Sequence, residues 1–159
     1  MRKILLLIAV IATSISANAQ TRSVNLELLG SSGMAGINYD ARFKGNNGFG
    51  YSVGVGYGYS NSGIDILDTA GNDGVTHGLS VPVELNYLFG QNNSHFVLGA
   101  GAMAGLSVNE AAKKPVFAYN VFADVAYRYQ KPKGFAFSVG VKPNLLTVFW
   151  PYISIGYSF

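Results

Sequence analysis

Residues 116–129 read VFAYNVFADVAYRY, a stretch in which apolar or aromatic side chains alternate with a second, more polar set. Tyr119 and Val125 fall on one parity, whereas Asp124 and Arg128 fall on the other. Successive side chains of a β-strand point to opposite faces of a sheet, so this period of two predicts a strand with one apolar face and one polar face.

The same alternation recurs along most of the chain, and Gly, Asn, Ser and Pro, which are typical of turns, interrupt it at intervals. No helical periodicity of useful length is present. We therefore predict an all-β fold with eight strands. The expected strands span residues 23–30, 34–43, 49–59, 77–89, 95–108, 116–129, 135–143 and 151–159.

Every charged side chain within these strands lies on the parity opposite to the apolar face. A soluble sandwich or a lipocalin-like barrel also alternates, but it buries its apolar face. An apolar face that continues around eight strands is too large to fill a narrow barrel. We expect an eight-stranded antiparallel up-and-down transmembrane β-barrel that encloses the charges in its lumen. The expected lumen charges are Glu27, Asp40, Arg42, Glu84, Asp124, Arg128 and Lys142.

Aromatic residues gather at the two ends of the predicted strands, with aliphatic residues between them, as expected for two girdles at the membrane interfaces. One girdle comprises Phe43, Phe49, Phe89, Phe96, Tyr127, Tyr129, Phe135 and Phe159, and the other comprises Tyr57, Tyr59, Phe117, Tyr119, Phe149 and Trp150. The short connections 44–48, 90–94 and 130–134 then face the periplasm. The connections 60–76, 109–115 and 144–150 face outward.

Charged residues make up 12% of the 159 residues, about half of the roughly 25% typical of soluble domains. No apolar run is long enough for a spanning helix. Arg2 and Lys3 precede the apolar run 4–12, and Ala17-Asn18-Ala19 has the small-x-small pattern of a cleavage site. We predict a signal peptide at residues 1–19 and a single barrel domain at 20–159, exported to the outer membrane of a Gram-negative bacterium.

Several segments resemble the small outer-membrane β-barrel proteins common in Bacteroidetes, which are barrels of the OmpX and OmpA type. The resemblance covers nearly the whole chain after the predicted signal peptide and implies the same fold and location. It also implies that Ile155, Tyr157 and Phe159 form the signal read by the barrel-assembly machinery. The segments are ELLG (27–30), INY (37–39), PVELNYLFG (82–90), HF (95–96) with Gly99 and Gly101, YRYQKP (127–132) and ISIGYSF (153–159).

The expected lumen charges have two interpretations: a filling network of ion pairs and hydrogen bonds, or a path for protons or ions. Glycines on the inward parity, such as Gly50, Gly54 and Gly99, either make room for long side chains or line a water-filled passage. Pro82 interrupts a strand that a closed barrel should pair on both sides, so we expect a bulge or local unpairing there.

Some eight-stranded outer-membrane barrels modify lipid A with a histidine, a serine and an acid. Here His77 and His95 are expected at opposite ends of the barrel, and parity separates His77 from Ser80. We therefore expect no enzyme and no catalytic, cofactor-binding or metal-binding residue.

The sequence thus favours a monomeric barrel with a structural or surface-interaction role and a closed polar lumen. Its expected partners are outer-membrane lipid and, during insertion, the assembly machinery. The absence of a Lys/Arg cluster argues against nucleic acid. A narrow, porin-like channel for small molecules is the alternative, and a lipid-modifying enzyme is a more distant one.

Overall fold

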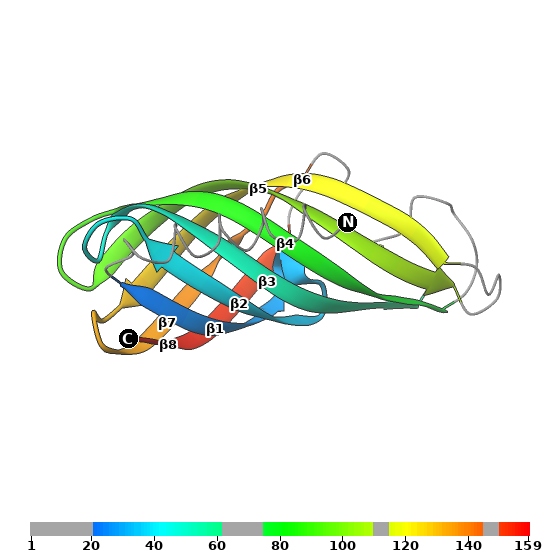
Figure 1. Cartoon of the computed structure of the whole chain (residues 1–159), viewed down its shortest axis with the longest axis horizontal. Helices are drawn as coiled ribbons and strands as arrows, with labels where there is room; N and C mark the ends of the chain where they lie inside the picture. Colours follow the sequence, from blue (N-terminus) through cyan, green and yellow to red (C-terminus); the bar gives the residue numbers. More distant parts are fainter. Residues whose placement is uncertain (1–20, 62–74, 110–114, 145–149) are drawn as a thin grey trace, which may run out of the picture.

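The computed structural model describes residues 21–61, 75–109, 115–144 and 150–159. Within these residues eight antiparallel strands form a closed barrel, in which each strand pairs with its sequence neighbours and β8 returns to β1 (Figure 1). This confirms the predicted fold class. The strands are β1 (Arg22–Leu29), β2 (Ala35–Arg42), β3 (Gly48–Asn61), β4 (Val75–Phe89), β5 (Ser94–Asn109), β6 (Pro115–Gln130), β7 (Gly134–Val141) and β8 (Pro151–Ser158).

The observed strand ends lie within two residues of the predicted ones, because the turn residues that bound each strand are readable from the sequence. A short 3-10 helix, η1 (Gly30–Ser32), connects β1 to β2. No helix among the described residues is long and apolar enough to cross a membrane. The predicted signal peptide lies outside the described residues.

Closure of the barrel depends on pairing between the first and last strands. Leu26 lies opposite Ile155, and Arg22 and Phe159 exchange both backbone hydrogen bonds, at 3.3 and 2.8 Å. Since an unpaired strand edge exposes a row of backbone donors and acceptors, this seam removes both edges of the sheet.

The two ends of the barrel differ. At one end, called here the turn end, the connections 43–47, 90–93 and 131–133 join the strands, close to Arg22 and Phe159. At the other, the loop end, β3 to β6 extend beyond the remaining strands (Figure 1). These four have 14 to 16 residues, whereas the other four have eight each.

Pro82 interrupts one side of its strand, as expected. It lies opposite Met103 in a continuous β4–β5 ladder. Towards β3, the pairing stops at Val53–Val83 and resumes at Gly56–Ser80 in the same register. The structure therefore has local unpairing without a bulge, because proline has no amide hydrogen to donate.

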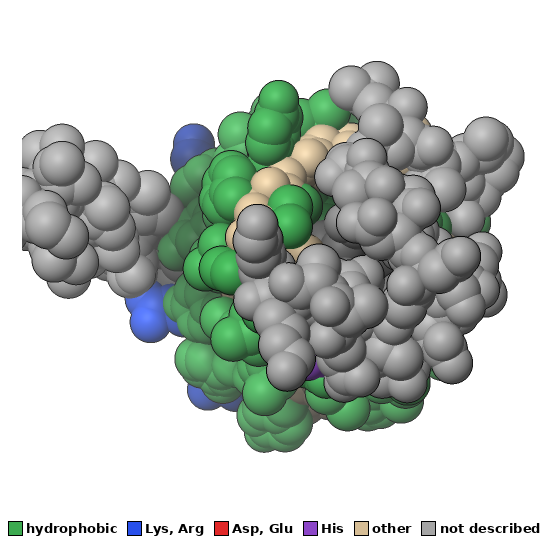
Figure 2. All heavy atoms as spheres, turned by 90° about the vertical axis from the view of Figure 1, so that its right-hand side faces the viewer, with side chains coloured by type: hydrophobic (Ala, Val, Ile, Leu, Met, Phe, Trp, Pro, Cys, Tyr) green, Lys and Arg blue, Asp and Glu red, His purple; other side chains and the backbone are tan. Residues whose placement is uncertain are grey.

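The outward face of the barrel is apolar, and hydrophobic side chains cover its visible wall in Figure 2. Ile37, Leu85 and Leu106 are 61%, 63% and 59% exposed, respectively. Aromatic side chains are exposed at both ends, as with Phe49 at the turn end and Phe117 at the loop end.

One residue assigned to the outer girdle is placed wrongly by the sequence pattern. Trp150 is buried, at 7% exposure, in a cluster with Met103, Ala118 and Phe122. It immediately precedes β8, and outside a strand the two-residue period does not fix which way a side chain points. The side chain of Tyr59 and all of Phe149 lie outside the described part of the chain.

Candidate functional site

The structure places all seven of the predicted lumen charges inside the barrel, with exposures of 0–6%. Strands β1, β2, β4 and β6 supply six of them, and the seventh follows β7 directly. The pleat of each strand directs them inward. The residues are Glu27, Asp40, Arg42, Glu84, Asp124, Arg128 and Lys142.

Asp40, Arg42 and Arg128 form one group, the Asp40 cluster. Oδ2 of Asp40 accepts from Nη2 of Arg42 at 2.7 Å and from Nη1 of Arg128 at 3.0 Å. Arg128 also donates to the Ser23 hydroxyl at 2.9 Å, and Arg42 donates to the Gly48 carbonyl at 3.2 Å. Two guanidinium groups thus share one buried carboxylate, which leaves this cluster positively charged.

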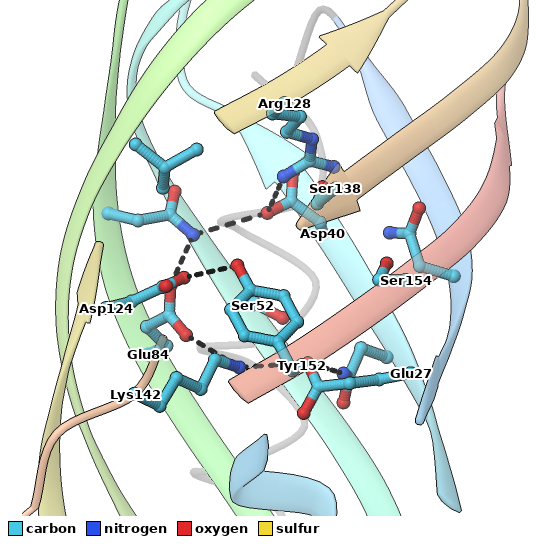
Figure 3. Close-up of a pocket in the computed structure, with 14 residues that line it drawn as sticks. Glu27, Asp40, Ser52, Glu84, Asp124, Arg128, Ser138, Lys142, Tyr152 and Ser154 are labelled. Carbon is cyan, nitrogen blue, oxygen red and sulfur yellow. Dashed lines mark hydrogen bonds and ion pairs between the residues drawn. The ribbon is translucent and has the colours of Figure 1, made fainter. Parts of the chain in front are cut away.

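Glu27, Glu84 and Lys142 form the second group, the Lys142 cluster (Figure 3). Nζ of Lys142 lies 2.9 Å from Oε2 of Glu27 and 3.4 Å from Oε2 of Glu84. It also lies over the rings of Tyr152 and Phe122, 4.5 and 5.4 Å from their centroids. Carboxylates and aromatic faces both attract a buried ammonium group.

The amide side chain of Asn86 connects the two clusters. Asn86 donates to Glu84 at 2.9 Å and to Asp40 at 3.4 Å, and its carbonyl oxygen accepts from Arg42. Asn38 donates to Glu27 at 2.9 Å. The six charged side chains of the two clusters therefore belong to one network of hydrogen bonds and ion pairs that crosses the barrel from β1 and β2 to β4 and β6.

Asp124 lies at the edge of this network. Its Oδ2 accepts from the Tyr152 hydroxyl at 3.0 Å (Figure 3), and it belongs to none of the four ion pairs found among the described residues. It lines, with Glu84 and Arg128, a polar cavity of about 30 Å³. That volume has room for roughly two water molecules.

The inward glycines make room for polar side chains. A Cβ at Gly50 would overlap the guanidinium of Arg42, and one at Gly54 would overlap the amide of Asn38. A Cβ at Gly99 would lie 2.7 Å from Oε1 of Glu84. Strands β3 and β5 therefore supply the space into which side chains from their neighbours extend, which favours the space-filling interpretation over an open passage.

Among the described residues, side chains occupy the lumen towards both ends. At the loop end, η1 folds inward, so that Ser31 and Ser32 are buried, and Ser31 accepts from Lys142 at 3.0 Å. The cluster around Trp150 adjoins Lys142, because the Trp150 carbonyl accepts from the Lys142 amide and Lys142 lies over the ring of Phe122. At the turn end, Arg42 and Gln130 have no exposed surface.

Residues that sequence reasoning missed complete this interior. Ser31 falls in the short connection between the first two expected strands, and the expected lumen residues include neither Phe122 nor Trp150. The parity of Phe122, between Asn120 and Asp124, was a usable signal. No sequence signal marks Ser31, because a three-residue connection has no periodicity to read.

The two histidines occupy different faces. His95 is 2% exposed, inside the barrel. His77 lines an outward groove of about 450 Å³ with Tyr57 and Leu79, whereas Ser80 is buried inside. Among the described residues no cluster of three or more potential ligands could hold a metal ion.

No protein-family model matches the sequence, and no curated protein matches it. The barrel is similar to the solved structure of the N-terminal β-barrel domain of Pseudomonas aeruginosa OprF, with a TM-score of 0.60, 11% sequence identity, and coverage of 89% of this chain and 98% of that chain. Ail, the attachment invasion locus protein of Yersinia pestis, has a TM-score of 0.42 and 15% identity, over 87% of this chain and 95% of that chain. The similarity to OprF shows the fold.

Replacing Lys142 by Met should destabilise the barrel by about 3–5 kcal/mol, because Glu27 and Glu84 would remain buried without their cation. Lys133→Met removes the same charge from an exposed turn residue and should change stability by at most about 0.5 kcal/mol. Urea unfolding in uncharged detergent would measure both. Equal stability of the two variants would contradict a stabilising role for the Lys142 cluster.

Proposed function

We propose that this protein is an integral β-barrel of a Gram-negative outer membrane, with a closed polar interior and a structural or surface-interaction role. The observation that carries the proposal is its inverted polarity. Large apolar side chains cover the outward face, whereas the seven lumen charges are buried inside. Water would oppose this arrangement, but the hydrocarbon of a bilayer favours it.

The exposed aromatic residues at both ends support a membrane position. Aromatic rings are enriched where hydrocarbon meets headgroups. At the turn end, Phe49, Phe89 and Phe135 are 65%, 46% and 49% exposed, and at the loop end Phe117 and Tyr119 are 64% and 75% exposed. Since bacterial outer-membrane barrels have short periplasmic turns, we assign the turn end to the periplasm.

A closed interior is supported by the packing of the lumen. An eight-stranded barrel is only wide enough for side chains to fill it. Here the Asp40 cluster, the Lys142 cluster and the cluster around Trp150 occupy the interior, and a polar cavity of about 30 Å³ lies among the charged residues. These observations favour a structural or surface role over a narrow channel.

The enzyme alternative lacks a supporting geometry in the described residues. His77 and Ser80 belong to opposite faces of β4, so the imidazole cannot take a proton from that hydroxyl. The closed seam and the absence of an unpaired edge between β1 and β8 suit a monomer in membrane lipid.

The assembly role of the last strand also belongs to the proposal. Ile155, Tyr157 and Phe159 are half-exposed on the outward face of the strand that pairs with β1. A chaperone or insertase can therefore reach these side chains while the seam forms.

Val139 faces outward and is 46% exposed. Replacing it by Arg should lower the stability of the barrel in lipid vesicles by about 2–4 kcal/mol, because the charge would lie in the hydrocarbon. Phe49→Arg, near the turn end, should lower stability by at most about 1 kcal/mol, because the charge would lie close to the membrane interface. Folding titrations in vesicles measure both. Equal costs would contradict a bilayer around the barrel.

Planar-bilayer recordings should show no steady, large openings of the wild-type protein, because the polar cavity among the lumen charges, of about 30 Å³, has room for only about two waters. Heat-modifiable gel migration of the same sample would show that folded barrel is present. Reproducible single-channel openings would contradict a closed interior and support the narrow channel instead.

Phe159→Ala should slow insertion in cells, so that unfolded protein accumulates in the periplasm. Phe135→Ala is the matched control, because Phe135 is an outward-facing aromatic of similar exposure at the same end of the neighbouring strand. Pulse-chase labelling read by heat-modifiable migration would compare their rates. Identical rates for both variants and the wild type would refute an assembly role for Phe159.

A further inference from the structure

The turn end of the barrel is uniformly basic. Lys44, Lys131 and Lys133 are exposed, and Arg22 is partly exposed beside Phe159. No Asp or Glu occurs in the turns 43–47, 90–93 and 131–133 or in the strand residues next to them. The three exposed lysines therefore have no acidic side chain in these turns or in the strand residues beside them.

The acidic residues of the chain lie elsewhere. Four of the eight are buried in the lumen network. The other four fall in the segments that connect β3 to β4 and β5 to β6, outside the described residues. They are Asp65, Asp68, Asp73 and Glu110. The Lys44, Lys131 and Lys133 ammonium groups thus have no ion-pair partner among the described residues.

Hydrogen bonds between the turns hold this surface together. The Asn46 amide donates to the Asn92 carbonyl at 3.3 Å and to the Gln130 carbonyl at 3.2 Å. Asn47 donates to the Gly90 carbonyl at 3.1 Å. The turn that carries Lys44 is therefore fastened to the residue that precedes Lys131, and the lysines project from one preorganised platform.

Exposed aromatic residues adjoin the lysines in the sequence and indicate the depth of this platform. Lys44 follows Phe43, which is 38% exposed, and Lys133 lies two residues before Phe135, which is 49% exposed. Aromatic rings prefer the boundary between hydrocarbon and headgroups. Lysines just beyond that boundary extend their flexible stems to the level of the phosphates.

We propose that Lys44, Lys131 and Lys133 form a binding surface for the phosphate headgroups of anionic phospholipids in the periplasmic leaflet. The inference rests on the proposed membrane position and adds a partner at one end of the barrel. Each basic residue near an anionic membrane surface is worth about 1 kcal/mol, which corresponds to about fivefold in association. The surface orients the barrel by charge as well as by its apolar belt.

The test compares lipid association around the protein purified from outer membranes and reconstituted in bilayers. Electron paramagnetic resonance with spin-labelled phosphatidylglycerol and phosphatidylcholine gives the relative association of each lipid. The wild type should prefer phosphatidylglycerol about two- to fivefold, and high salt should weaken that preference by screening. The K44Q/K131Q/K133Q variant should lose the preference, whereas K44R/K131R/K133R, which keeps the charge, should retain it.

Other outcomes would overturn the proposal. Equal association of both lipids with the wild type, or an unchanged preference in the Gln variant, would refute it. Competition by inorganic phosphate beyond that of chloride at equal ionic strength would indicate a small-anion site instead. Lysine-dependent co-sedimentation with peptidoglycan, without lipid preference, would assign the surface to acidic cell-wall peptides.

Heat-modifiable migration of each reconstituted sample separates these outcomes from failure of the proposed function. A folded, inserted barrel without lipid preference refutes only the binding surface. A protein that does not fold into the bilayer at all refutes the membrane assignment.

Discussion

The pairing of β8 with β1 is the constraint on which the rest of this structure depends. A sheet that closes on itself satisfies its backbone donors and acceptors between strands, and only a closed sheet can do so in hydrocarbon. Once the seam between Leu26 and Ile155 is formed, no backbone edge remains between the first and last strands. The outward-facing side chains can then all be apolar, and the polar side chains must fit inside the barrel.

That accommodation explains the composition of the lumen. A narrow barrel cannot hydrate many separate charges, so Asp40 is shared by two guanidinium groups and Lys142 contacts two carboxylates and two aromatic rings. Breaking such a buried pair costs far more than the pair itself contributes. The network therefore specifies one arrangement of the interior, and glycines on β3 and β5 provide the space that it needs.

The same barrel separates charge along its axis. Acidic side chains of the strands are buried inside the barrel, where each accepts a hydrogen bond or forms an ion pair. Exposed lysines lie at the turn end, where Asn46 and Asn47 hold the turns together. Apolar burial fixes the depth of a barrel in a bilayer, but it is nearly symmetric about the midplane. A basic surface at one end makes the two ends of the barrel unequal, because it interacts favourably only with anionic headgroups.

The sequence by itself determined the strands, their faces and the inward position of all seven lumen charges, because a two-residue period converts parity directly into direction. It did not determine which charges meet. Lys142 reaches Glu27, 115 positions away in the chain, and only closure of the barrel brings them together. Nor did it determine the inward fold of Ser31 or the burial of Trp150. Both lie outside regular strands, where the backbone has no period and the surrounding packing decides which way a side chain points.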